Sequence, residues 1–509
     1  MVKLRRKIFI ISIIFLLIIG LSGCSENPIE QMVKGDKKEN FNTLIIDDYN
    51  GVNLDEINEY NIDIEFDPEE KIYTGNQEVK YINNEKETLE NVYFHIYPNT
   101  FKDKETAPFL FGDYDSAYPN GFEAGYIDIK NVLINGDEVN YTILGEGKTI
   151  LKLDLKEKLE PGEKINIEME YTAKLPSAQD RFGYGDKTYN FGNWYPIAAV
   201  YDDDGWNLDP YYSIGDPFYS DVSNYNVEII APKEMEIASS GNILSEKNKG
   251  KNKVWKIESQ LMRDFAWVAS EEFEKIVKNH DGTSIKLYFL EGVKEEVKKA
   301  AIDYSTKSID HFNNIYGKYP YGQYSVVQTS FPSGMEYPGI VYIGEDYYNK
   351  NTLGSLEIII AHETAHQWWY GVVGNDEIDE SWLDESLATY SEYLYAYEEY
   401  DEDVSKDYYE KSIENNYEIS KDYIEDNTVV KSLDEFNGWD DYGPLAYSRG
   451  AMMIYDIENK YGKKELYKIF QEYFKEYSFK NATTEDFIDI IKRVTGENME
   501  DLVDEYLYD

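Results

Sequence analysis

The sequence predicts a multidomain protein with a β-rich N-terminal domain followed by a mainly α-helical, α+β domain. At roughly 100 to 200 residues per domain, the 509 residues correspond to about two to four domains. The composition is 42% hydrophobic and 15% aromatic, which supplies enough apolar surface for large cores and excludes a disordered chain. Near residue 274 the sequence pattern changes from short alternating runs to long helical stretches.

Residues 1–23 have the pattern of a secretory signal peptide, with a basic start and an apolar run from Ile8 to Ile19. That run is shorter than the ~20 residues a helix needs to span a membrane, so a signal anchor is the weaker alternative. Leu21, Ser22 and Gly23 precede Cys24, and this stretch resembles the bacterial lipobox. We therefore expect lipidation of Cys24 and a lipid-anchored protein on the extracytoplasmic face of the cell membrane.

Residues 24–58 are polar and predict a tether, although Thr43 to Ile46 could pair as a strand instead. Residues 59–273 predict the β-rich domain, because short β-branched or alternating runs are separated by Gly, Pro, Asn and Asp. The clearest runs are Tyr60 to Phe66, Gln77 to Ile82, Val92 to Tyr97, Thr149 to Leu153, Ile165 to Tyr171, Tyr225 to Ile230, Val254 to Ile257 and Phe265 to Ala269.

Residues 274–509 predict the second domain, in which a small sheet near Ile285 to Phe289 comes first. Glycines and prolines between Tyr319 and Gly344 indicate further strands and turns. The helical stretches that follow from the apolar periodicity are Val293 to Tyr316, Leu356 to Tyr370, Glu380 to Tyr400, Leu445 to Tyr461 and two more up to the end.

The charge and the cysteine content exclude several classes of function. The net charge is −48, and so negative a surface repels the phosphate backbone, which excludes nucleic-acid binding. Cys24 is the only cysteine, so the chain has no intrachain disulfide and no cage of thiolates for a metal. Any bound metal must therefore be held by histidine and carboxylate side chains.

His362, Glu363 and His366 form an H-E-x-x-H motif after an apolar run from Leu356 to Ile360. Residues four apart lie one above the other on a helix, so both imidazoles can reach one metal ion. Two imidazoles, one carboxylate and a water suit a single Zn²⁺ ion, which lowers the pKa of the water to about 7. Glu363 is then placed to take a proton from that water. Glu385, on the next predicted helix, is the expected third ligand.

With these motifs the sequence resembles the zinc aminopeptidases of the aminopeptidase N and leukotriene hydrolase family, which are gluzincin metallopeptidases. The separation of His366 and Glu385 by 18 residues matches that family. The run from Ser333 to Tyr337 resembles its G-x-M-E-N motif, and the run from Leu445 to Ala451 resembles its Y-x-K-G stretch. The resemblance covers nearly all of the mature chain and implies a thermolysin-like catalytic domain. It also implies a short form without the C-terminal helical domain.

The resemblance assigns roles to individual residues. Glu336, with Gly334 and Met335, would bind substrate by holding the free α-amine of a peptide, and Tyr447 would donate a hydrogen bond to the oxyanion. Tyr442 has a counterpart in some relatives, and Asn193 is the candidate for a β-domain residue that assists the α-amine. Tyr337 stands where the family usually has Asn, which would reshape the pocket for the first side chain.

The expected function is therefore a zinc aminopeptidase that removes N-terminal residues from peptides outside the cell. One alternative is an endopeptidase with the same metal centre, which the short chain favours. The other is a surface binding protein without catalysis. Amino-terminally blocked peptides separate the first two hypotheses, because only an endopeptidase should cleave them.

Overall fold

The computed structural model describes residues 42–109 and 114–509, so the predicted signal peptide and Cys24 lie outside the described residues. Residues 40–509 form one compact unit, and the domain boundaries inferred from the sequence stay predictions. Among the described residues, no helix combines the length and the apolar character needed to cross a membrane.

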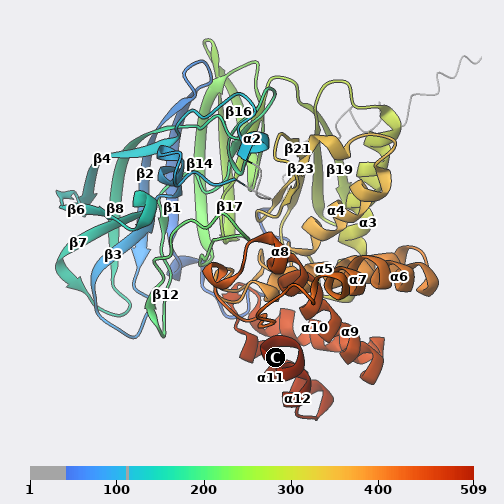
Figure 1. The fold of residues 1–509 in the computed structure, drawn as a ribbon. Coiled ribbons are helices and arrows are strands. Elements are labelled where there is room, and N and C mark those ends of the chain that lie inside the picture. Colours follow the sequence, from blue (N-terminus) through green and yellow to red (C-terminus); the bar gives the residue numbers. More distant parts are fainter. Residues whose placement is uncertain (1–41, 110–113) are drawn as a thin grey trace, which may run out of the picture. The chain divides into compact units, whose positions relative to one another are not determined.

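The β-rich part is built on an eight-stranded sheet in which β1 pairs in parallel with β14 and the other strands pair antiparallel. The inward side chains of β1 alternate with exposed ones, which is why Tyr60, Ile62, Ile64 and Phe66 reach the core. In sheet order the strands are β16 (Asn242–Lys249), β17 (Asn252–Met262), β14 (Ser223–Pro232), β1 (Glu59–Asp67), β2 (Ile72–Ile82), β8 (Lys164–Lys174), β4 (Tyr126–Ile134) and β5 (Asp137–Glu138) (Figure 1).

Smaller sheets and short helices complete this part. One four-stranded sheet consists of β15 (Glu236–Ser239), β18 (Trp267–Ser270), β10 (Tyr189–Phe191) and β9 (Phe182–Tyr184). The other consists of β11 (Ile197–Ala198), β3 (Leu89–His95), β7 (Ile150–Leu159) and β6 (Tyr141–Leu144), and β12 (Tyr201–Asp202) pairs with β13 (Gly205–Trp206). The helical turns are η1 (Leu54–Glu56), η2 (Tyr97–Lys102), α2 (Tyr114–Ala117) and η4 (Glu146–Lys148).

The second part opens with a mixed five-stranded sheet in which β21 (Gln323–Thr329) and β23 (Ile340–Gly344) are buried along their whole length. Its order is β19 (Glu274–His280), β20 (Thr283–Phe289), β21, β23 and β22 (Gly334–Met335). Leu44 forms an isolated antiparallel bridge with Tyr321, just before β21, and the backbone N–H of Ile45 donates to the carbonyl of Pro320, so this end of the predicted tether lies against the second part.

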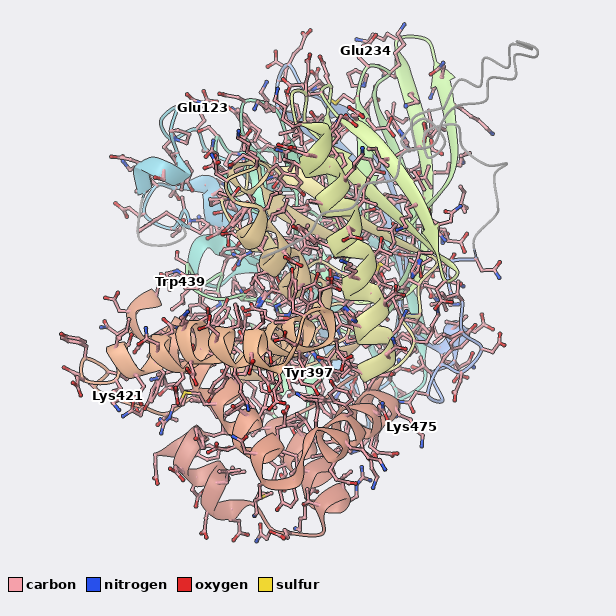
Figure 2. The ribbon with its side chains drawn as sticks, turned by 90° about the vertical axis from the view of Figure 1, so that its right-hand side faces the viewer. Glu123, Glu234, Tyr397, Lys421, Trp439 and Lys475 are labelled. Carbon is pink, nitrogen blue, oxygen red and sulfur yellow. The ribbon has the colours of Figure 1, made fainter. Side chains whose placement is uncertain are left out.

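Helices α3 (Glu295–Ile315), α4 (Leu353–Ala365) and α5 (Trp382–Glu399) follow, and the short η5 (Glu345–Tyr347) precedes α4. In the side view, α3 (yellow) and the helices from α5 to α7 (orange) face the reader (Figure 2). The remaining elements are α6 (Glu402–Tyr408), η6 (Tyr409–Glu414), α7 (Asn415–Ser420), η7 (Leu433–Glu435), α8 (Trp439–Tyr442), η8 (Gly443–Arg449), α9 (Gly450–Tyr461), α10 (Lys463–Tyr477), α11 (Thr484–Thr495), α12 (Glu500–Val503) and η9 (Asp504–Tyr508), with β24 (Val373–Gly374) paired to β25 (Lys480–Asn481).

Two helices differ from the ranges predicted from the apolar pattern. The stretch from Leu356 to Tyr370 is helical only as far as Ala365, because the chain turns after His366 and Tyr370 takes a positive φ of 97°. The stretch that begins at Leu445 starts as a π-helix, η8, before it continues as α9. Both irregularities lie beside the predicted site residues, where such local departures are common.

Arg263 links the two parts of the chain after β17. Its Nε donates to the carbonyl of Tyr370 at 2.9 Å, and its guanidinium also donates to the carbonyls of Ser220 and Lys480 and to the side chain of Asn481. Because Arg263 is only 1% exposed, these bonds fix the end of the β-rich part against the turn that follows His366.

Candidate active site

Helix α4 brings His362 and His366 together. The helix is hydrophobic on nearly every side and packs Leu356, Ile360 and Ala361 into the core, so its last turn is held rigidly. The two imidazoles lie one turn apart, with their Nε2 atoms 3.1 Å from each other. Two Nε2 atoms that face each other at this distance are arranged as ligands of one ion.

Glu385, in the first turn of α5, completes this group. Its Oε2 lies 3.4 Å from Nε2 of His362 and 3.5 Å from Nε2 of His366. Tetrahedral zinc holds nitrogen and oxygen ligands at about 2.0 to 2.1 Å, which places ligand atoms about 3.3 Å apart. Oε2 of Glu385 is buried and has no hydrogen-bond partner. The three residues therefore fit a divalent ion of the zinc type, and the structure brings all three predicted ligands together.

The outer nitrogens of both histidines are also engaged. Nδ1 of His362 donates to Oε1 of Glu392 at 2.6 Å, and Nδ1 of His366 donates to the carbonyl of Trp369 at 3.2 Å. Tyr408 donates to the other oxygen of Glu392. Placing the protons on Nδ1 leaves each Nε2 lone pair free for a metal, and such outer partners fix the orientation of the rings.

Glu363 lies beside this group with a free carboxylate oxygen. The side chain is 5% exposed, and its Oε2 has no hydrogen-bond partner. Burial raises the pKa of Glu363 to about 7, against the opposing effect of His362 and His366. A Cβ atom on Gly334 would come within 1.9 Å of Oε1 of Glu363, so any larger residue there would displace the Glu363 carboxylate. A carboxyl group with a pKa near neutrality suits a residue that accepts and returns a proton.

Glu336 follows the short strand β22 and faces the same space. It is 4% exposed, and its Oε1 is buried without a hydrogen-bond partner. Met335 is turned elsewhere: its Sδ accepts a hydrogen bond from Nε of Arg181 at 2.9 Å, and the residue is absent from the described cavity lining. The side chain of Met335 therefore points away from the cavity, because alternate residues of a strand point to opposite faces, and its contact with substrate stays a prediction.

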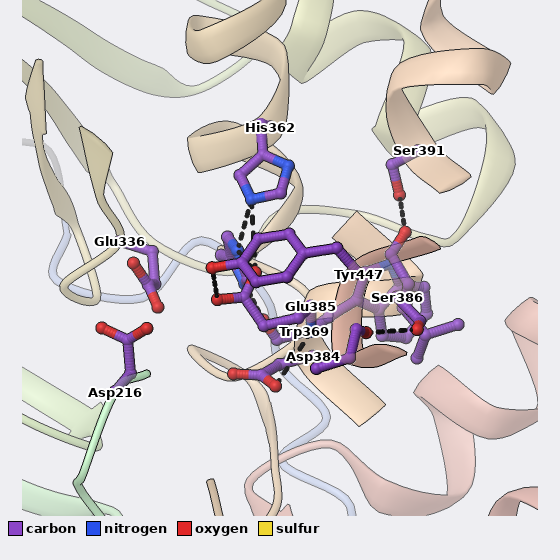
Figure 3. Close-up of polar contacts among 12 residues, drawn as sticks. Asp216, Glu336, His362, Trp369, Asp384, Glu385, Ser386, Ser391 and Tyr447 are labelled. Atoms are coloured by element: carbon purple, nitrogen blue, oxygen red, sulfur yellow. Dashed lines mark hydrogen bonds and ion pairs between the residues drawn. The ribbon is translucent and has the colours of Figure 1, made fainter. Parts of the chain in front are cut away.

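Asp216, from the loop before β14, faces Glu336 across the cavity (Figure 3). Oxygen atoms of Asp216, Glu336 and Glu385 all lie within 4.8 Å of one another. Nη2 of Arg181 donates to Oδ1 of Asp216 at 2.6 Å. Burial and the neighbouring Asp216 raise the pKa of Glu336 well above its ordinary value. A cation bound among these carboxyl groups would offset their mutual repulsion and favour their ionised form.

The space among these carboxylates suits an ammonium group. An ammonium that donates hydrogen bonds of about 2.8 Å in tetrahedral directions holds its acceptors about 4.6 Å apart. The oxygens of Asp216, Glu336 and Glu385 lie within 4.8 Å of one another, so a single ammonium can reach them together.

Tyr447 reaches the metal group from the π-helix η8. Its hydroxyl donates to Oε1 of Glu385, and its ring lies parallel to the His362 ring at 6.0 Å. Burial and the nearby Glu385 raise the pKa of Tyr447 well above its ordinary value, so the hydroxyl stays protonated and remains a donor. Tyr442 packs edge-on against Tyr447 at 5.7 Å and is itself buried, as a packing residue would be.

Asn193 and Tyr337 lie away from the cavity. Tyr337 donates to Oδ1 of Asn193 at 2.6 Å, and Nδ2 of Asn193 donates to Asp264 at 2.9 Å. Both ends of the Asn193 amide are therefore used, and the residue is not placed to hold an amine. Tyr337 is fully buried in the same network, so it does not reshape the pocket as expected from the sequence.

The comparison with known proteins agrees with this geometry. Residues 300–506 match the sequence profile of the peptidase family M1 domain. This segment of the chain belongs to peptidase family M1. The resemblance seen in its motifs is thereby confirmed, and the motifs from Ser333 to Ala451 all fall within the matched segment.

Curated M1 relatives are longer than this chain. Aminopeptidase 2 from Candida albicans is 24% identical over 453 residues, which cover 82% of this chain and 46% of that relative. Aminopeptidase M1-D from Oryza sativa is 24% identical over 310 residues, which cover 55% of this chain and 34% of that relative. The chain thus spans about a third to a half of the length of these relatives.

The fold is that of solved M1 structures. The crystal structure of an M1 zinc metallopeptidase from Deinococcus radiodurans aligns with a TM-score of 0.63 at 15% identity, covering 89% of this chain and 94% of that chain. The predicted fold class, a β-rich N-terminal domain followed by a thermolysin-like α+β domain, is confirmed by this match.

Sequence reasoning missed three residues of this candidate site, namely Asp216, Arg181 and Glu392. Glu392 could have been found, because it lies seven residues after Glu385 and so on the same face of one helix. Asp216 and Arg181 lie outside the segment that matches family M1, in loop and strand-edge positions without a local motif. Only the fold brings them to the cavity.

Proposed function

We propose that this protein is a zinc-dependent aminopeptidase. The observation that carries the proposal is the pair of adjacent groups in one cavity, a metal triad of His362, His366 and Glu385 and a carboxylate group that includes Asp216 and Glu336. A triad alone would suit any zinc peptidase. Buried carboxylates beside it favour a substrate with a free α-ammonium, because such a cation pairs with them in their ionised form.

Different residues of the cavity have different roles in the proposed hydrolysis. Asp216 and Glu336 hold the α-ammonium, which sets the scissile bond one residue away from it. When bound, zinc supplies Lewis-acid chemistry, since it polarises a carbonyl and lowers the pKa of a water. Glu363 takes the proton of the attacking water and returns it to the leaving amine. The Tyr447 hydroxyl turns from Glu385 to donate to the developing oxyanion.

The named relatives support this assignment. The matched curated proteins are called aminopeptidases, and one of the similar crystal structures is described as an M1 zinc metallopeptidase mutant bound to a Tyr-Ser-Ala substrate. Peptides with a free amino terminus are accordingly the proposed substrates of this chain.

Metal reconstitution tests the proposal. We expect one zinc per chain by atomic emission, hydrolysis of an alanyl-amide reporter, loss of that activity with a chelator and its return with zinc. His362→Ala should lose both zinc and activity. Two results would contradict the proposed function. One is unchanged hydrolysis by a zinc-free His362→Ala protein, and the other is a fully zinc-loaded wild-type protein that hydrolyses no free-amine peptide.

The location is a further part of the proposal. The lipobox-like run that ends at Cys24 supports a lipoprotein anchored on the extracytoplasmic side of the membrane, where it would meet peptides outside the cell. Expression with a labelled fatty acid in a bacterial host tests this. Label should enter the wild-type protein and be absent from Cys24→Ser, and equal labelling of the two would refute the anchor.

A further inference from the structure

The walls of the active-site cavity carry an uneven set of charges. The cavity has a volume of about 740 Å³, and its carboxylates are Asp216, Glu336, Glu363, Glu385 and Glu392. Among the described residues that line it, Arg181 is the only lysine or arginine. Even with a divalent ion bound, the formal charge of this lining is negative.

Arg181 is not available to a substrate. Its Nη2 donates to Asp216 at 2.6 Å and to the carbonyl of Gly215 at 2.9 Å, and its Nε donates to Met335. Its side chain is 5% exposed and lies between the rings of Phe218 and Phe331, at 5.6 and 5.8 Å from their centres. The one guanidinium of the cavity is therefore already neutralised and fixed in place.

A dipeptide would place its terminal carboxylate inside this cavity. Two extended residues span about 7 Å, so a dipeptide whose amine is held by Glu336 and Asp216 and whose scissile carbonyl faces the metal triad ends one residue past the triad. The cavity lining next to His362 includes Glu392 and Tyr408, which are joined by a hydrogen bond, and Ser412 and Asn416 also line the cavity. These four residues carry one negative charge and no positive charge, so a carboxylate that ends among them loses water without gaining a cationic side chain as its partner.

We propose that the cavity selects against a free carboxylate close to the scissile bond. Its substrates are peptides of three or more residues, or peptides with an amidated end, and dipeptides with a free carboxylate are poor substrates. This inference rests on the proposed aminopeptidase function and adds the substrate class to it. The proposed selection acts on charge and not on size. The amide and the acid of one dipeptide have nearly the same shape, so a difference between their rates reports the effect of the charge alone.

The test compares Leu-Ala with Leu-Ala-amide, with Leu-Ala-Ala as a reference, on the zinc-loaded full chain. Released leucine gives kcat/KM for each peptide. We expect the amide and the tripeptide to exceed the dipeptide acid at least tenfold, and we expect the gap to narrow as ionic strength rises. Equal kcat/KM for the acid and the amide would overturn the inference while leaving the proposed function intact.

A gain-of-charge variant adds a second test. Ser412 lines the cavity from an exposed position on η6, so Ser412→Lys should supply the missing cation and lower the amide-to-acid ratio at least threefold. Asn415→Lys adds the same charge on a neighbouring residue that does not line the cavity, and its ratio should equal that of the wild type. Equal ratios for both variants would overturn the inference, and no hydrolysis of any of the three peptides would overturn the proposed function with it.

Discussion

At the scale of single residues, Glu363 is the proposed general base, and it is distinct from the three proposed metal ligands. The prediction for Glu363→Gln is full zinc binding with a loss of about 10²- to 10⁴-fold in kcat, because the amide cannot accept the proton. Zinc content and kcat should be measured on the same sample. A zinc-loaded variant with more than a tenth of the wild-type kcat would reject Glu363 as the base.

The second prediction at this scale concerns Asp216 and Glu336, which are proposed to bind the α-ammonium of the substrate. Asp216→Asn keeps an acceptor for Arg181 but removes the charge, so it should raise KM for free-amine peptides at least tenfold and change kcat less. Glu336→Gln should act in the same direction. Asp221→Asn, five residues further along the chain and outside this cavity, is the matched control and should behave as the wild type. An unchanged KM in both Asp216→Asn and Glu336→Gln would show that these two residues do not bind the substrate amine.

At the scale of secondary-structure elements, the geometry of the three proposed metal ligands depends on the packing of α4 against α5. Glu392 fixes His362 from α5, so Glu392→Gln should weaken zinc binding by about 10- to 100-fold, as seen for outer partners of metal ligands. Competition with a chelator measures this. Glu398→Gln, at an exposed position on the same helix, should leave zinc affinity unchanged, and equal zinc affinity in the two variants would contradict the role of Glu392.

The sequence predicted the helices of the site well where a local pattern, such as residue spacing or an apolar run, determines the structure. The spacing of His362 and His366 places both on one helix face, and the apolar run before them predicts a buried helix, as observed. The end of α4 was placed too late, because Trp368 and Trp369 continue the apolar pattern while the chain already turns. No local sequence pattern predicts that Asp216 lines the cavity, because its position depends on contacts with residues distant in the sequence, such as Arg181.

At the scale of the whole molecule, buried carboxyl groups couple stability to pH. Asp264 is 1% exposed, and burial raises its pKa to about 6 from an ordinary 3.8. Between these values the folded state binds more protons than the unfolded state, so the contribution of Asp264 to stability falls as pH rises. Across the window the change is about 3 kcal/mol at most.

Urea unfolding of the chelated protein checks this prediction. The wild type should lose part of its stability advantage over Asp264→Asn between about pH 5 and about pH 7, because only the wild type titrates this group. If the difference between the two proteins stays constant over that range, Asp264 does not titrate as inferred.

The central claim is that one cavity joins a zinc triad to an anchor for a free amine. Its most direct test is the cleavage of one peptide with its amine free and with its amine acetylated, followed by mass spectrometry of the zinc-loaded protein and a chelated control. The account predicts stepwise loss of residues from the amino end of the free peptide alone, abolished by chelation. Internal cuts in both peptides would contradict it and would make the protein an endopeptidase in which Glu336 and Asp216 hold no amine.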